Sequence, residues 1–210
     1  MIRRPPRSTL SSSSAASDVY KRQIKAIDAG VTELGESRVQ EALPKIESIN
    51  RLRSGIRWHF IGHLQTNKVN KIASCVSMIQ SVDSLRLAEK ISAANRDSAA
   101  PLDVLLEIKV SEEDSKFGIP PEEVLRNIKA INKLSGIRLK GFMAMAPYFD
   151  NAQEAVPYFR QARKLFDSAR AAAPGMDTLS MGMSGDYEAA IDEGATMIRI
   201  GSAIFGARNY

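Results

Sequence analysis

The chain has 210 residues, enough for one domain with a sizeable core but short of the about 250 that a complete (β/α)8 barrel usually needs. Its 44% hydrophobic and 25% charged content is ordinary for a globular protein, and no apolar run approaches the ~20 residues that cross a bilayer. Cys75 is the single cysteine, and His59 and His63 are the only histidines, which excludes an intrachain disulfide and a four-ligand zinc site built from these side chains. We therefore expect a cytoplasmic protein with no metal and no membrane partner.

The net charge of +5 lies mostly at the N-terminus. Residues 1–23 contribute +4, and the remaining 187 residues contribute only +1. A surface that binds nucleic acid should carry its basic residues on the folded domain. The charge therefore argues against a nucleic-acid partner.

Residues 1–23 contain two adjacent prolines and four consecutive serines, with no periodic apolar pattern. Such a stretch can be a disordered tail, or an organellar transit peptide, because it is rich in Arg and Ser and nearly free of acid. It also resembles translated adaptor or vector sequence. We favour this foreign origin because the helical pattern starts at Ile24 without a cap or a preceding strand. The expected domains are therefore a non-native or disordered leader, 1–23, and one barrel domain, 24–210.

From Ile24 onward, helical segments alternate with short apolar strands. The first helix ends at Ala29, because Gly30 suits the left-handed residue that closes helices. The pattern then predicts strands at 31–35, 57–62, 76–82, 102–110, 137–145, 178–183 and 196–201, separated by helices at 38–50, from about 66, and at 84–95, 120–134, 154–173 and 187–193.

This alternation predicts an α/β fold with a parallel sheet and helices outside it. An open, doubly wound sheet would show the same alternation, but no G-x-G-x-x-G follows any strand, so its dinucleotide-binding form loses support. Seven strands follow a first helix that has no strand of its own. The count fits a (β/α)8 TIM-type barrel that lacks strand 1.

In such barrels a phosphate commonly binds the loops after the last two strands. Here those loops contain Ser184, and then Gly201 and Ser202. Because Gly201 has no side chain, phosphate oxygens could approach the backbone, and a short helix from Ser202 would offer further N–H groups. The alternative is that both serines are helix caps and Gly201 forms a tight turn.

Six stretches carry a resemblance to a known family: GESRVQEALPKI (35–46), WHFIGHLQTNKV (58–69), SVDSLRLAEKI (81–91), EDSKFGI (113–119), GFMAMAP (141–147) and LSMGMSGDYEAAIDEGATMIRIGSAIFG (179–206). Together they closely resemble the pyridoxal phosphate homeostasis proteins, which have the fold of the N-terminal domain of alanine racemase. The resemblance runs from about Ile24 to Tyr210.

The resemblance implies pyridoxal 5'-phosphate as the cofactor. By position, Ser184, Gly201 and Ser202 would hold its phosphate, and Arg199 would face its pyridine nitrogen. A guanidinium can only donate hydrogen bonds, so it discourages protonation of that nitrogen and suits a carrier better than a carbanion enzyme. An ion pair in the barrel core is the alternative for Arg199. Three further residues are expected near the cofactor: Met143 and Met183, which could equally be core, and Ser37, where the family usually has asparagine.

The chain departs from the family at the lysine that binds the cofactor. Relatives carry the lysine that binds the cofactor covalently in a Val-Ser-Lys segment, and this chain contains no such segment. Lys21 lies in the leader. Lys109 shares a strand face with Glu107, and we expect these two to form a buried pair if that face points inward. The cofactor is therefore expected to bind non-covalently.

The two histidines are expected to be structural. His59 alternates with Trp58 and Phe60, so it lies on the opposite face of its strand. His63 follows Gly62 at the end of the same strand, which also allows a gating role.

We expect a non-catalytic carrier that binds pyridoxal phosphate reversibly, buffers it, and delivers it to apoenzymes that depend on it. The expected assembly is a monomer or weak dimer. Two alternatives remain: an amino-acid racemase, which in this fold group needs the lysine and a tyrosine from a second domain, and a truncated barrel that binds no ligand.

Overall fold

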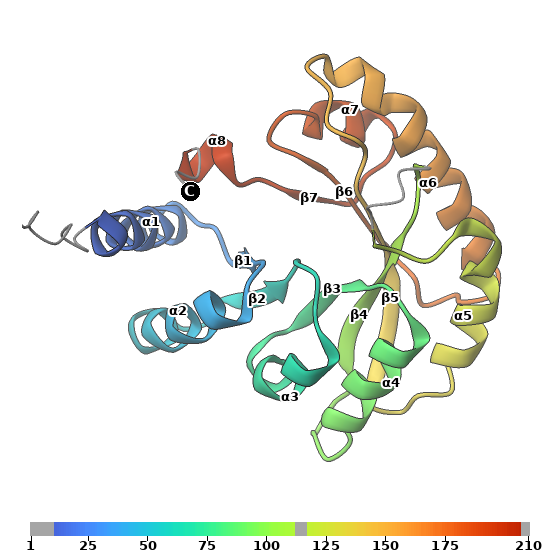
Figure 1. The fold of residues 1–210 in the computed structure, drawn as a ribbon, viewed down its shortest axis with the longest axis horizontal. Helices are drawn as coiled ribbons and strands as arrows, with labels where there is room; N and C mark the ends of the chain where they lie inside the picture. The colour runs from blue at the N-terminus through green and yellow to red at the C-terminus, as the bar shows by residue number, and fades with distance from the viewer. Residues whose placement is uncertain (1–10, 112–116, 207–210) are drawn as a thin grey trace, which may run out of the picture.

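The computed structural model describes residues 11–111 and 117–206 (Figure 1). The first ten residues of the predicted leader, four residues of the EDSKFGI stretch and the last four residues of the chain lie outside this part. Seven parallel strands form one sheet, in which each strand pairs with the next along the chain. All seven predicted strands are confirmed: β1 (Glu33–Glu36), β2 (Arg57–Phe60), β3 (Met78–Val82), β4 (Leu102–Ile108), β5 (Ile137–Ala144), β6 (Thr178–Met183) and β7 (Met197–Arg199).

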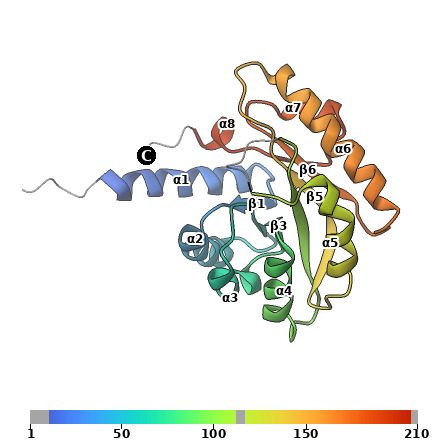
Figure 2. The same ribbon diagram turned by 45° about the vertical axis from the view of Figure 1, so that its right-hand side comes forward.

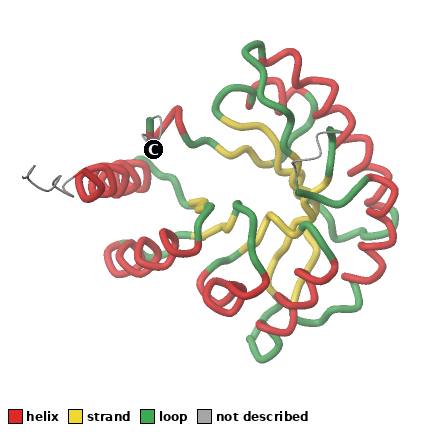
Figure 3. The backbone as a smooth tube through the Cα atoms, in the orientation of Figure 1, coloured by secondary structure: helices red, strands yellow, loops and turns green. Residues whose placement is uncertain are grey.

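Helices lie outside the sheet, as Figure 3 shows in red around the yellow strands. None of the described helices is long and apolar enough to cross a membrane. They are α1 (Ser11–Asp28), α2 (Val39–Leu52), α3 (Val69–Ile72), α4 (Leu85–Ala94), α5 (Val124–Ile131), α6 (Val156–Arg170), α7 (Tyr187–Asp192) and α8 (Ser202–Phe205), with 3-10 turns η1 (Thr66–Lys68), η2 (Ala73–Cys75), η3 (Pro121–Glu123) and η4 (Ala152–Ala155).

The sheet curls into a barrel that stays open between β1 and β7, its two edge strands (Figure 1). Both views show α1 and α8 side by side next to this opening (Figure 2). There the Arg22 guanidinium donates to the Phe205 carbonyl oxygen. Strand pairing in the described chain thus follows a (β/α)8 barrel with one strand position open.

The two faces of the sheet have different partners. Trp58 and Phe60 are buried against the helices, and Trp58 Nε1 donates to Asn50 Oδ1 on α2 at 3.1 Å. The alternate residue, His59, points into the barrel because successive strand residues face opposite sides. A small apolar cluster fills part of the interior: Met78, Leu105 and Met143.

The first helix begins earlier than its apolar pattern predicts. It starts at Ser11 rather than near Ile24, and no proline interrupts it before its end. Gln23, which we assigned to the leader, is buried, and its Nε2 donates to Glu36 Oε1 on β1 at 3.0 Å. Tertiary contact with β1 therefore supports helix where local sequence did not predict it. As predicted, Gly30 closes this helix with a positive φ of 101°.

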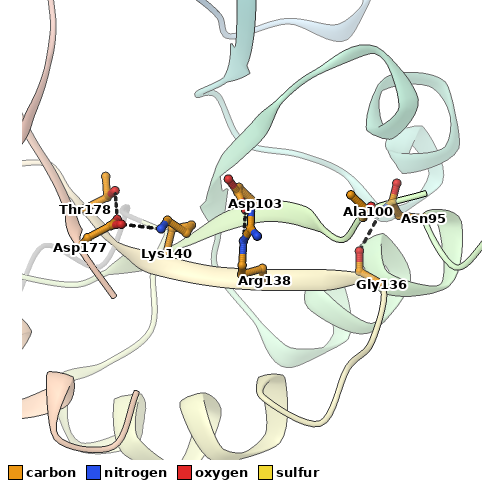
Figure 4. A network of polar contacts seen from close by, with 8 residues as sticks. All are labelled: Asn95, Ala100, Asp103, Gly136, Arg138, Lys140, Asp177 and Thr178. Atoms are coloured by element: carbon orange, nitrogen blue, oxygen red, sulfur yellow. Dashed lines mark hydrogen bonds and ion pairs between the residues drawn. The ribbon is translucent and has the colours of Figure 1, made fainter. Parts of the chain in front are cut away.

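Ion pairs and hydrogen bonds join neighbouring strands at the amino-terminal end of the barrel (Figure 4). Arg138 Nε donates to Asp103 Oδ1 at 2.7 Å, and Lys140 Nζ donates to Asp177 Oδ2 at 2.5 Å. The Asn95 amide donates to the carbonyl oxygen of Gly136 at 2.8 Å. These contacts stabilise the end opposite the carboxyl ends of the strands, where ligands bind in such barrels.

Candidate functional site

The loops after β6 and β7 meet at one hydroxyl group. Ser184 Oγ accepts the backbone N–H of Gly201 at 3.1 Å and that of Ala203 at 3.3 Å. Ser202, between these two residues, is the first residue of α8 and is exposed. The structure therefore brings together the three residues that the sequence predicted as phosphate ligands.

There is open space beside Gly201. A Cβ atom built at this position would meet no heavy atom within 4 Å. Two backbone N–H groups that converge on a single oxygen, with free volume next to them, can satisfy the oxygens of a phosphate monoester. This loop pair therefore fits the phosphate end of the expected cofactor.

Arg199 extends from the end of β7 into the barrel. Its Nη1 donates to Ser180 Oγ at 2.7 Å, and its Nη2 donates to the Ala144 carbonyl oxygen at 3.0 Å. Burial lowers the pKa of Arg199 to about 10, with Glu107 and Asp186 opposing the shift. The guanidinium remains protonated at neutral pH and has a fixed orientation.

The remaining predicted site residues lie in different environments. Met143 is fully buried and sits in register between Glu107 on β4 and Ser180 on β6. Met183 is 39% exposed, and its backbone N–H donates to Asp186 Oδ1 at 2.6 Å. Met143 thus belongs to the barrel interior, whereas Met183 is open to a ligand at the mouth.

Ser37 is half-buried and follows β1 at the carboxyl end of the sheet. Its carbonyl oxygen would lie 2.1 Å from a Cβ atom at Gly62, just after β2. The absence of a side chain at Gly62 therefore lets the two loops pack directly against each other. This contact sets the position of Ser37.

Glu107 has a different partner from the one predicted. Glu107 is only 4% exposed, and Lys109 is not among the charged groups that shift the pKa of its carboxyl. The pKa of Glu107 is raised to about 7, mainly by burial and also by Asp83, while Arg199 opposes the shift. The expected Glu107–Lys109 pair is wrong, because β4 ends at Ile108 and Arg199 on β7 is the cation that acts on the carboxyl across the barrel.

Sequence reasoning missed the partners of His63. Its Nδ1 lies 3.1 Å from Asp83 Oδ2, and its ring stacks on Phe117 with centroids 3.8 Å apart. Asp83 ends the β3 stretch in sequence, so its place at a strand end was a usable signal. Phe117 follows β4 by several residues, and no local pattern connects it to His63.

The comparisons with known proteins cover most of the chain. The family model described as "Alanine racemase, N-terminal domain" matches residues 18–209. The pyridoxal phosphate homeostasis protein of Haemophilus influenzae is 42% identical over 189 residues, which are 89% of this chain and 80% of that protein. That of Escherichia coli (strain K12) is 42% identical over 191 residues, with the same two coverages.

A solved structure shares the fold. PipY of Synechococcus elongatus, with pyridoxal phosphate bound, superposes with a TM-score of 0.82 at 33% identity, covering 89% of this chain and 87% of PipY. Sequence and fold thus agree over the same part of the chain. The chain belongs to the alanine racemase N-terminal domain family and, within it, to the pyridoxal phosphate homeostasis proteins.

Proposed function

We propose that this protein binds pyridoxal 5'-phosphate at the carboxyl end of its barrel and serves as a reversible carrier of the cofactor. The observation that carries the proposal is the convergence of the Gly201 and Ala203 N–H groups on Ser184 Oγ. In the complex, phosphate oxygens replace Ser184 Oγ as the acceptor of these N–H groups, and the Ser184 hydroxyl donates to the same phosphate. PipY, a relative of known structure, binds pyridoxal phosphate.

The ring of the cofactor lies toward Arg199 in this proposal. When bound, the cofactor supplies an aldehyde that reacts reversibly with amines. Arg199 can only donate a hydrogen bond, so it leaves the pyridine nitrogen unprotonated. The ring is then a weak electron sink, which favours holding and release of the cofactor over carbanion chemistry. Cofactor homeostasis is therefore the function that the site supports best.

Three further properties of the protein are proposed on the same basis: how it holds the cofactor, where it works, and which proteins receive the cofactor. We propose that the cofactor is held non-covalently by this chain, that the protein works in the cytoplasm, and that apoenzymes requiring the cofactor receive it. We also propose that the part of the N-terminal stretch outside the family match, residues 1–17, is foreign.

Calorimetric titration tests the binding proposal. We expect pyridoxal phosphate to bind more tightly than pyridoxal, because pyridoxal lacks the phosphate that the loops after β6 and β7 bind. Glycerol phosphate should compete with pyridoxal phosphate, because it occupies the same phosphate site. Borohydride treatment of the complex should attach the cofactor to no single lysine in stoichiometric amount, since no specific lysine bond forms in the site. Absence of heat and of competition at millimolar ligand would reject the proposed function.

A further inference from the structure

Four polar side chains form a continuous hydrogen-bonded chain across the inside of the barrel. Arg199 Nη1 donates to Ser180 Oγ at 2.7 Å, and Ser180 Oγ donates to Gln80 Oε1, also at 2.7 Å. Gln80 Nε2 lies 2.9 Å from His59 Nδ1. The chain therefore runs from β7 through β6 and β3 to β2, and it links the predicted ring-binding residue to the far side of the barrel.

The direction of each bond follows from the arginine. A guanidinium has donors only, so the Ser180 oxygen must accept from Arg199, and its single proton is left for Gln80. The Gln80 amide nitrogen then donates to His59 Nδ1. A neutral His59 must consequently carry its proton on Nε2, a buried atom that has no hydrogen-bond partner among the described residues and lies 3.9 Å from Glu33 Oε2.

The orientation of the Gln80 amide has independent support. Its Nε2 also lies 3.1 Å from Met197 Sδ, a weak acceptor. The nitrogen thus faces two acceptors, a thioether and an imidazole, while the oxygen faces a hydroxyl. A flipped amide would turn its oxygen toward the thioether sulfur, lose the Met197 contact, and require a proton on His59 Nδ1.

These contacts are shielded from water. His59, Gln80 and Ser180 are 4%, 1% and 0% exposed. Burial lowers the pKa of His59, although Glu33 opposes the shift, so the ring is held in the neutral form that the chain requires. A buried donor or acceptor that loses its partner is costly. Each member therefore constrains the next.

We propose that His59 and Gln80 are positioning residues for the Arg199 guanidinium. By accepting the Ser180 proton, Gln80 keeps a lone pair of that oxygen turned toward Arg199, and His59 holds the Gln80 amide in place. Without Gln80, the Ser180 hydroxyl can rotate freely. In some orientations its O–H group then points at the Arg199 N–H group, and the two donors cannot form a hydrogen bond. The inference rests on the proposed function, in which Arg199 contacts the cofactor ring.

The test compares two ligands on two variants. Gln80→Met keeps a side chain of similar length but removes both polar atoms. Met78→Leu, on the same face of β3, is the matched control for a change inside the barrel. We expect Gln80→Met to weaken pyridoxal phosphate binding by about threefold to tenfold. Glycerol phosphate, which has no ring, should bind both variants as it binds the unmodified protein.

If Gln80→Met weakens the binding of both ligands equally, Gln80 has a general structural role. If it weakens the binding of neither ligand, Gln80 does not position Arg199. Either result overturns the inference. The Arg199→Gln background separates the inference from the function beneath it. There, Gln80→Met should have no further effect on pyridoxal phosphate binding. If it keeps its full effect, the inference alone is wrong, whereas an Arg199→Gln variant with unchanged affinity overturns the ring contact itself.

A measurement on the unmodified protein avoids any folding defect of the variants. Nitrogen chemical shifts report which imidazole nitrogen carries the proton. We expect the Nε2–H tautomer of His59 in the full chain near neutral pH. An Nδ1–H tautomer would break the chain of donors at its last link and overturn the inference.

Discussion

The hydroxyl oxygen of Ser184 and the backbone nitrogen of Gly201 lie 3.1 Å apart, which joins the loops after β6 and β7. We predict that Ser184→Ala weakens pyridoxal phosphate binding by about tenfold, because one donor to the phosphate is lost. Calorimetric titration measures this change. Ser168→Ala, on the exposed side of α6, is the control and should bind normally. Equal affinity of both variants would remove Ser184 from the phosphate site.

Arg199 uses two nitrogen atoms at once, one on Ser180 and one on Ala144. A lysine at this position keeps the charge but has no planar fork, so it cannot reproduce both bonds. We predict that Arg199→Lys lowers the free energy of unfolding by about 1–3 kcal/mol. Urea denaturation should show almost no change for the control Arg51→Lys, whose ion pair with Glu47 is exposed, since exposed ion pairs contribute little. A loss as small as that of the control would contradict the structural role of the fork.

Glu107 predicts a pH dependence of stability. Its pKa is raised from 4.5 to about 7, mainly by burial. Between these pH values the folded protein holds a proton that the unfolded chain has released. The free energy of unfolding therefore falls as the pH rises through this window, by on the order of 3 kcal/mol in full.

The variant Glu107→Gln removes this titration. Between pH 4.5 and pH 7, we expect the thermal stability of this variant to change less than that of the unmodified protein. At pH 8 the variant should be the more stable of the two. Glu122→Gln, which changes an exposed carboxylate, should keep the original dependence. If Glu107→Gln has the same pH profile as that control, Glu107 is not the titrating group.

Gly62 makes a close backbone contact with Ser37. A Cβ atom there would lie 2.1 Å from the Ser37 oxygen, so Gly62→Ala must push the two loops apart. We predict a loss of about 1–3 kcal/mol in unfolding free energy, with weaker cofactor binding. Gly175→Ala, where a Cβ atom meets nothing within 4 Å, should leave both quantities unchanged. Matching results for the two variants would refute the tight contact.

The open edges of β1 and β7 predict poor solubility, because unpaired strand edges pair with other chains. We expect an added N-terminal strand ending in Val-Ser-Lys to raise the soluble fraction and to give the yellow colour of covalently held cofactor. The same segment with alternate prolines is the control, since proline cannot donate to a ladder. Equal solubility with either segment would contradict edge pairing as the cause.

The start of β2, both boundaries of β6 and the place of Ser184 and Gly201 at strand ends could be read from the sequence. Each depends on a short run of residues: an apolar stretch forms a strand, and the polar or glycine residues after it form the loop. A parallel barrel places all such loops at one end. Local pattern therefore predicted the fold and the phosphate loops together.

Three features of the structure could not be predicted from the local sequence pattern. Gln23, which the helical pattern did not include, bonds to β1, and Arg199 rather than Lys109 acts on the Glu107 carboxyl. Gln80 and Ser180 are 100 residues apart and bond inside the barrel. Such contacts follow from strand register and barrel curvature, which bring distant residues face to face. The sequence by itself determined the barrel and its phosphate loops, and only the tertiary structure decided which polar groups meet inside it.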